Sequence, residues 1–334
     1  MKGCFVSKNG IKIDYVFGGG RKAQLSSELD MLDEIISRAN MDTFKEKLQD
    51  IDVIFATWDM EDFTQAEVRD YFPNLKAVFY AAGSVRYFAG PFLESGVKVI
   101  SAWGAMAIPV AEFTVSQIVQ ANKGYYLAMS LFREKGYADA NALATRAFPG
   151  TYHTKVGILG AGMIGKLVIH MLKSYSVDIF VYDPFMSEEQ AISLGVKKSS
   201  LEEIFSECQT ISNHIANNPQ TVGMLDYKLF TLMKNNAAFI NTGRGAQVVE
   251  ADLARALREK PERCAILDVT YPEPCPPEHE FWQLPNLFLT PHIAGLAAAE
   301  VWRMADYMMA EFRRFKQGQR LEYEVTLSML STMA

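Results

Sequence analysis

Long apolar runs, clustered cysteines and blocks of basic residues are all missing from this 334-residue chain. No uncharged apolar stretch approaches the roughly 18 residues that a membrane helix needs, so we expect no membrane partner. The four cysteines lie far apart without CxxC spacing. This spacing favours reduced thiols in a cytoplasmic protein over a disulfide framework or a metal site. Residues 1–8 lack the apolar core of a signal peptide, which gives the same expectation of a cytoplasmic location.

Charge and composition narrow the class further. There are 33 Lys and Arg against 39 Asp and Glu, a net charge of −6, and no dense basic run, so we expect no nucleic-acid partner. Hydrophobic residues make up 49% and charged residues 22%, an ordinary globular mixture that excludes disorder, collagen and a coiled coil as the main architecture. At about 150 residues per domain, the length predicts roughly two domains.

The first hundred residues predict a small α/β domain. Residues 10–17 alternate like a half-buried strand, and residues 25–36 show apolar positions at helical spacing. Three short apolar runs, at 53–56, 77–80 and 97–100, are bounded by polar or turn residues. Such runs suit buried parallel strands separated by helices.

A long helix is predicted from Pro109 to Met129, with Pro109 in its first turn, before a break at Pro149 and Gly150. A second α/β unit then begins near Thr151. Its predicted strands are 155–159, 177–182, 210–214, 238–241, 265–269 and 287–290, and its predicted helices are 166–173, 200–205 and 250–258. Alternation of this kind predicts a parallel sheet. A last helix, 297–315, carries Val301, Met304, Met308 and Phe312 on one face and is expected to return to the first domain.

The glycine motif of the second unit has the setting that a dinucleotide fold requires. Gly160-Ala161-Gly162-Met163-Ile164-Gly165 follows an apolar strand, opens a helix, and Asp183 ends the next strand. Gly160 permits a tight turn, Gly162 lets the backbone approach a pyrophosphate, and Gly165 allows close packing of the helix on the sheet. The helix N-terminus offers N–H groups to the phosphates. A glycine-rich turn beside a surface aspartate is the simpler interpretation, but it does not explain the combined spacing.

The acidic residue also favours one cofactor. Asp183 can accept hydrogen bonds from ribose hydroxyls and would repel a 2′-phosphate, and the next three residues, Pro184, Phe185 and Met186, include no cation. The sequence therefore favours NAD over NADP.

Three segments each place one ionisable residue after a predicted strand of this unit. They are 241–245 with Arg244, 268–274 with Glu273, and 290–295 with His292. Ligands of open parallel sheets bind beyond the carboxyl ends of the strands, where these side chains would gather. An imidazole can take up a hydroxyl proton near neutral pH, a paired carboxylate orients it, and a guanidinium binds a carboxylate in a fork.

Each of these residues also has a simpler interpretation. Arg244 between two glycines suits a phosphate contact or a surface charge, and Glu273 in a proline-rich loop suits an exposed carboxylate. His292 after a proline suits a helix cap. The other four histidines have no comparable setting and are interpreted as structural or solvated.

The ordered segments GAGMIG, YDP, NTGRG, DVTYPEP and LPNLFLTPHIAG, together with residues 110–114, resemble the D-isomer-specific 2-hydroxyacid dehydrogenase family. The resemblance covers about residues 110–295. It implies two Rossmann- or flavodoxin-like domains with parallel sheets, a substrate domain from 1–104 and 296–334, and an NAD-binding domain, 105–295, inserted between them. It also implies a site in the cleft between the domains, and a homodimer formed through the nucleotide domain and its long helix.

Roles for individual residues follow from the resemblance. It implies that Arg244 binds the substrate carboxylate and carbonyl, that His292 is the acid/base and that Glu273 is its partner. The implied cofactor contacts beyond the three glycines are Met163, Ile164, Asp183, Ile215, Ala216, Thr221, Thr242, Gly243 and Asp268.

The substrate loop departs from the family pattern. The stretch 81–88 stands where the family usually has a sequence like GAGVDNID, and Ala216 stands where a proline is common. The expected substrate contacts are Ala82, Gly83, Ser84, Arg86 and Trp103. Arg86 and Trp103 suit a bulkier or more anionic substrate, or else they pack at the domain interface.

The resulting hypothesis is an NAD-dependent oxidoreductase that interconverts a small-molecule 2-keto acid and a D-2-hydroxy acid. Formate dehydrogenase, which resembles the same family, typically has glutamine where Glu273 stands, because formate oxidation needs no proton transfer. An NAD(H)-binding regulatory or sensor protein of the same fold, with little or no turnover, is the remaining alternative.

Overall fold

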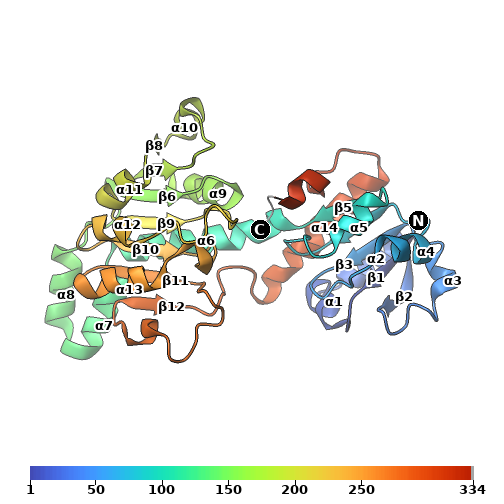
Figure 1. Ribbon diagram of the computed structural model, residues 1–334, viewed down its shortest axis with the longest axis horizontal. Helices are drawn as coiled ribbons and strands as arrows, with labels where there is room; N and C mark the ends of the chain where they lie inside the picture. The colour runs from blue at the N-terminus through green and yellow to red at the C-terminus, as the bar shows by residue number, and fades with distance from the viewer. Residues whose placement is uncertain (332–334) are drawn as a thin grey trace. The chain divides into compact units, whose positions relative to one another are not determined.

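The computed structural model describes residues 1–331, and its contacts divide the chain into two compact units. Unit 1 comprises Met1–Met106 and Leu296–Ala334, and unit 2 is Ala107–Gly295. The first boundary lies two residues beyond the predicted one. Each unit is an α/β structure built around one sheet (Figure 1), so the α/β class predicted from the sequence is confirmed.

Unit 1 has a six-stranded sheet among its described residues. The strands are β1 (Lys2–Val6), β2 (Asp30–Ile36), β3 (Val53–Ala56), β4 (Ala77–Tyr80), β5 (Lys98–Ser101) and β13 (Glu324–Val325). The order is β13-β5-β4-β3-β1-β2, with β13 antiparallel to β5 and the other pairs parallel. The helices are α1 (Ile11–Val16), α2 (Arg21–Glu28), α3 (Lys45–Leu48), α4 (Gln65–Tyr71), α5 (Ala89–Glu94) and α14 (Trp302–Lys316).

Two predictions for unit 1 are wrong. Residues 10–17 form helix α1 and not a strand, because Ile13 and Val16 are buried three residues apart while Ile11 is exposed. The helix predicted over 25–36 stops at Glu28, and the rest of that range is the edge strand β2. Both ranges are short, and apolar residues in short ranges fit a helical and a strand period almost equally.

The central strands of unit 1 were predictable. Every residue of β3 and β4 is buried, as expected for strands covered on both faces. In α14, Val301 just before the helix and Met304, Met308 and Phe312 within it are all buried, and they belong to the core of unit 1.

The prediction of one helix from Pro109 to Met129 is wrong at both ends. Helix α6 spans Trp103–Asn122, so Pro109 lies inside it and not in its first turn. Gly124, with φ of 67°, ends the run and starts α7 (Tyr125–Lys135). A β-carbon at Gly124 would lie 2.2 Å from the ring of Phe148, so the backbone turns where no side chain fits. Helix α8 (Tyr137–Arg146) packs against α7.

Unit 2 contains a seven-stranded sheet of parallel pairs in the order β12-β11-β10-β9-β6-β7-β8. The strands are β6 (Thr154–Leu159), β7 (Val177–Tyr182), β8 (Lys197–Lys198), β9 (Thr210–Asn213), β10 (Ala238–Asn241), β11 (Cys264–Leu267) and β12 (Leu287–Leu289). The helices that follow α8 are α9 (Met163–Leu172), α10 (Glu188–Leu194), α11 (Leu201–Glu207), α12 (Tyr227–Leu232) and α13 (Glu250–Glu259). The elements β8, α10 and α12 are short, and the sequence pattern does not predict them.

Both faces of the second sheet are covered. Neighbouring residues of one strand, such as Phe239 and Ile240 in β10, belong to different hydrophobic clusters. This two-sided burial explains why the strands are uninterrupted apolar runs in the sequence. Among residues 1–331, no helix is both long enough and apolar enough to cross a bilayer.

Candidate active site

The glycine turn joins the end of β6 to the start of α9. Gly160 has φ of 89°, and a β-carbon at Gly165 would lie 2.0 Å from the carbonyl oxygen of Gly160. At Gly162, no atom of the described residues would lie within 4 Å of an added β-carbon. The turn is therefore closed on the sheet side at Gly165 and open at Gly162, beside the N-terminus of α9. Met163 and Ile164, both predicted cofactor contacts, form the first two positions of that helix.

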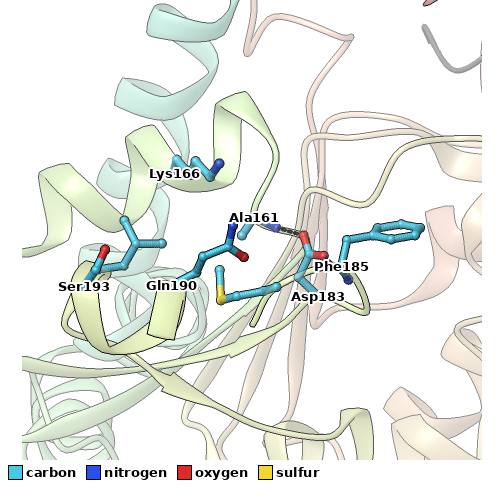
Figure 2. Close-up of a pocket in the computed structure, with 8 residues that line it drawn as sticks. Ala161, Lys166, Asp183, Phe185, Gln190 and Ser193 are labelled. Carbon is cyan, nitrogen blue, oxygen red and sulfur yellow. Dashed lines mark hydrogen bonds between the residues drawn. The ribbon is translucent and has the colours of Figure 1, made fainter. Parts of the chain in front are cut away.

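Asp183 connects the turn to the end of β7. One carboxylate oxygen accepts the Ala161 N–H at 2.7 Å, and the other accepts the Phe185 N–H at 2.8 Å. Figure 2 shows Asp183 beside Ala161 at the edge of a hollow that is also lined by Lys166 and Gln190. Each carboxylate oxygen keeps a further lone pair, so Asp183 can brace the turn and still accept a hydroxyl hydrogen bond.

The loop after β9 holds three of the predicted cofactor contacts. The Thr221 hydroxyl donates to the carbonyl of Ala216 at 2.8 Å and accepts the Asn218 N–H at 3.0 Å. Thr221 therefore fixes the shape of this loop, while Ala216 stays exposed and Ile215 is half-buried.

The loop after β10 carries Arg244. The hydroxyl of Thr242 lies 3.0 Å from that of Thr114 on α6, and the exposed Arg244 guanidinium donates to the carbonyl of Gly243 at 2.8 Å. A β-carbon at Gly245 would lie 2.1 Å from the carbonyl carbon of Thr270. This close approach packs the loop after β10, which we call the arginine loop because it carries Arg244, against the segment that leads to Glu273.

The side chains of Glu273 and His292 are in contact. Oε1 of Glu273 lies 2.6 Å from Nδ1 of His292, and their side chains are 41% and 49% exposed. The contact through Nδ1 leaves Nε2 as the ring nitrogen that can exchange a proton with a ligand. His292 has φ of 54°, in the left-handed region that side chains rarely adopt.

Asp268 holds this backbone conformation. Its Oδ1 accepts the Thr290 hydroxyl at 2.5 Å and the Ile293 N–H at 2.8 Å, and its Oδ2 accepts the Ala294 N–H at 2.8 Å. The main-chain carbonyl of Asp268 accepts the His292 N–H at 3.1 Å. The buried Asp268 therefore fixes the turn around His292. The contact with a carboxamide expected from the resemblance stays a prediction.

The predicted substrate loop lies in unit 1, after β4. The carbonyl of Ala82 accepts the Ala102 N–H at 2.9 Å and the Ser101 hydroxyl at 2.8 Å, and Ser101 also donates to the carbonyl of Gly83. Ser84 and Arg86 are exposed. Trp103 packs edge-on against Tyr323, with ring centroids 5.6 Å apart. Trp103 thus has a packing partner in its own unit, and the substrate contacts of this loop stay predictions.

Comparison with known proteins identifies this arrangement. Residues 115–294 match the model of the D-isomer specific 2-hydroxyacid dehydrogenase, NAD binding domain. The chain belongs to this family. The resemblance stated from the motifs is therefore confirmed, and so is NAD as the cofactor of the domain.

Relatives and solved structures extend the match. The chain is 30% identical over 247 residues to the D-3-phosphoglycerate dehydrogenase of Mycobacterium tuberculosis (strain CDC 1551 / Oshkosh), covering 74% of this chain and 46% of that one. It is 28% identical over 275 residues to the glyoxylate reductase of Korarchaeum cryptofilum, covering 82% of each. The chain spans about half the length of several curated relatives of the family. A phosphoglycerate oxidoreductase from Rhizobium etli superposes with a TM-score of 0.81 at 20% identity, over 98% of this chain and 99% of that one, and shows the shared fold.

The residues of unit 2 fit the family's cofactor. The turn leaves space at Gly162, where a pyrophosphate would approach, and the first N–H groups of α9 have no helical partners. Asp183 at the end of β7 presents acceptors for ribose hydroxyls. Among residues 1–331, no group of three or more His, Cys, Asp or Glu could hold a metal ion.

Sequence reasoning missed a carboxylate that supports the segment leading to Glu273. Oε1 of Glu250 accepts the Tyr271 N–H at 2.8 Å, and Oε2 lies 3.2 Å from Nε2 of His279. Burial raises the pKa of Glu250, while the Tyr271 N–H and His279 act in the opposite direction. His279 was interpreted as structural or solvated, and its contact is structural. The position of Glu250 was a signal for such a role, because this residue begins the helix that follows the Arg244 loop.

Proposed function

We propose that this chain is an NAD-dependent D-2-hydroxyacid dehydrogenase that interconverts a 2-keto acid and a D-2-hydroxy acid by hydride transfer. The observation that carries the proposal is the 2.6 Å contact between Glu273 and His292, in the same unit as the glycine turn and Arg244. Family membership supports it. Two relatives of similar sequence are named as a phosphoglycerate dehydrogenase and a glyoxylate reductase, and these names suggest 2-keto acids as substrates.

In the proposed reduction, the glycine turn and Asp183 would hold NADH, which would supply the hydride for the carbonyl carbon. Protonated His292 donates its Nε2 proton to the carbonyl oxygen, which becomes the hydroxyl, and the imidazole is left neutral. Glu273 holds Nδ1, which fixes the ring orientation through the transfer. Arg244 binds the carboxylate in a fork and polarises the adjacent carbonyl. Oxidation reverses each step.

Substrate selection is assigned to the loop in unit 1. The backbone N–H groups near Ala82, Gly83 and Ser84 would bind the substrate carboxylate, and Arg86 and Trp103 would set its size and charge. Because residues 81–88 depart from the family pattern, an NAD(H) sensor with little turnover is the second candidate function. Glu273 argues against formate oxidation, which needs no proton transfer.

We further propose a cytoplasmic homodimer that uses the hairpin of α7 and α8. None of the residues of α7 is buried, although the helix contains three aromatic residues, two leucines and a methionine. Tyr125, Phe132 and Tyr137 are 47%, 54% and 72% exposed. A second copy of the same hairpin would cover this apolar face.

The experiment that tests the enzyme proposal follows NADH absorbance with a panel of 2-keto acids. The panel contains pyruvate, glyoxylate, hydroxypyruvate, phosphonooxypyruvate, 2-oxoglutarate, and branched and aromatic keto acids. Consumption with one of them supports the proposal and names the substrate class. Tight NADH binding with no turnover of any member favours the sensor alternative.

A further inference from the structure

Three buried side-chain amides join the carboxyl ends of β9 and β10. Asn213, Asn241 and Gln247 are 0%, 1% and 0% exposed. The side-chain nitrogen of Asn213 donates to the amide oxygen of Gln247 at 2.6 Å and to that of Asn241 at 3.2 Å. We call these three residues the amide triad.

The amide triad holds two loops by their backbones. On one side, Asn213 Oδ1 accepts the Ile215 N–H at 3.2 Å, and Gln247 Nε2 donates to the Ile215 carbonyl at 2.5 Å. This arm fixes both main-chain groups of a residue predicted to line the cofactor groove.

The other arm reaches the arginine loop. Asn241 Oδ1 accepts the Gly243 N–H at 3.0 Å, and Asn241 Nδ2 donates to the Arg244 carbonyl at 3.0 Å. Asn213 is the member that touches both other amides, so the two arms share one side chain.

The hydrogen-bonding pattern around position 213 fits an amide side chain and neither a carboxylate nor an apolar side chain. Asn213 Nδ2 faces two oxygens, so a carboxylate in its place would meet two acceptors. An apolar side chain would leave the buried oxygens of Asn241 and Gln247 without this donor, which is costly in a buried site. Asn213 and Asn241 are the last residues of β9 and β10, and they follow buried apolar positions such as Ile211 and Phe239. The amides therefore occur where the strands meet the two loops.

We propose that the amide triad is a positioning device that holds the loop at Ile215, after β9, and the arginine loop at Arg244, after β10, in one fixed arrangement. The inference rests on the proposed function for the role of Arg244. The three residues are positioning residues, since they act through the backbone of the two loops. Replacing Asn213, the residue shared by the two arms, should therefore increase the mobility of both loops.

The test compares Asn213→Leu with Asn286→Leu in the full chain. Asn286 is a matched control, because its buried amide donates to the carbonyls of Leu257 and Arg263 and it precedes β12, away from the carboxyl ends. Hydrogen–deuterium exchange measures the segments around Ile215 and Arg244, fluorescence titration measures NADH affinity, and steady-state kinetics measures the keto-acid reaction.

For Asn213→Leu we expect about tenfold faster exchange in both segments, about tenfold weaker NADH binding and at least a tenfold loss of kcat/KM for the keto acid. Asn286→Leu should leave all three within twofold at comparable thermal stability. A third variant, Gln247→Met, should weaken NADH binding more than it reduces kcat, because it removes the bonds of Gln247 to Ile215 and Asn213 but leaves the bonds of Asn241 to Gly243 and Arg244 in place.

Equal effects of the two leucine variants would overturn the proposal and make the amide triad a purely structural feature. Unchanged exchange in Asn213→Leu would overturn it as well. If the wild-type chain turns over no keto acid, the proposed function fails, while the exchange and NADH-affinity measurements still decide whether the amide triad positions the two loops.

Discussion

The Glu273 carboxylate lies 2.6 Å from Nδ1 of His292, although the two residues are 19 positions apart on loops that follow different strands. The loop of Glu273 follows β11 and the loop of His292 follows β12, and these strands are paired. Asp268 ties the loops together, because it accepts N–H groups from the turn around His292. The pair is thus formed within unit 2 by the sheet itself.

Replacing His292 with alanine should retain NADH binding but reduce turnover by about 10²–10⁴-fold, which is the usual contribution of a positioned general acid. Glu273→Gln should cause a smaller loss, because the amide can still contact Nδ1 but carries no charge. Stopped-flow measurement of NADH oxidation tests both variants, with fluorescence titration as the control for cofactor binding. Near-normal turnover of His292→Ala would refute the assignment of the acid/base.

Two glycines of the same turn should respond differently to alanine. Gly162 has φ of −67° and ψ of −160°, a conformation open to alanine, and its added β-carbon meets no described atom within 4 Å. Gly162→Ala should therefore fold with unchanged thermal stability yet bind NADH at least tenfold more weakly, because the methyl group occupies the approach of the pyrophosphate.

Gly165→Ala is the structural counterpart. Its β-carbon would lie 2.0 Å from the carbonyl oxygen of Gly160, so the helix must move away from the sheet. We expect a loss of free energy of unfolding on the order of 3 kcal/mol, measured by urea denaturation. Normal NADH affinity in Gly162→Ala would show that the dinucleotide does not approach the turn at this position.

Parts of the site were predictable because their chemistry depends on local sequence. The glycine turn, Asp183 and the Arg244, Glu273 and His292 loops each lie beside a strand end that the apolar runs reveal. The contact partners of buried polar side chains were not predictable. Glu250 bonds to Tyr271 and Asn213 bonds to Gln247, which lie 21 and 34 positions away, and nothing in a single position marks an amide as buried.

The predicted type of secondary structure is wrong where the spacing of apolar residues fits both a strand and a helix. At residues 10–17 the alternation of apolar residues fits a strand, but tertiary packing buries Ile13 and Val16 on one side of a helix. At the start of the predicted helix 200–205, the spacing of Ser200 and Glu203 is typical of a capping box, and the structure forms one half of it. Ser200 accepts the Glu203 N–H, while the Glu203 carboxylate pairs with Lys197. An ion pair with a lysine six positions away thus takes the place of the second capping bond.

Charging the hairpin should separate the proposed dimer. Phe132→Glu places a carboxylate on the exposed face of α7, and burying that charge against a second copy is unfavourable. Light scattering after size-exclusion chromatography should report a monomer for Phe132→Glu and a dimer for the wild type. The control is Ile192→Glu on α10, an apolar position in unit 2 that is 76% exposed. A dimer that survives Phe132→Glu would place the interface elsewhere.

His214 should make the stability of the protein depend on acid pH. Burial lowers the pKa of His214 to about 4, and its Nε2 lies 2.9 Å from the Ser212 hydroxyl. In the unfolded chain the pKa of a histidine is about 6.5. Between these values the unfolded state binds a proton that the folded state does not, so the free energy of unfolding falls as the pH falls from about 6.5 to about 4. Above this range the residue is neutral in both states, and below it the residue is protonated in both.

The expected contribution of His214 is about 3 kcal/mol over that range, because each tenfold difference in proton affinity between the folded and unfolded states corresponds to about 1.4 kcal/mol. Urea denaturation of the wild type and of His214→Gln at pH 7.5 and pH 4.5 measures it, because other groups titrate in both proteins and cancel in the difference. The wild type should lose about 2 kcal/mol more than the variant between the two conditions. The exposed His170→Gln controls for the removal of a histidine and should lose stability in parallel with the wild type. Parallel curves for His214→Gln and the wild type would mean that the folded protein accommodates the charged imidazole, and the neutral state assigned to His214 would be wrong.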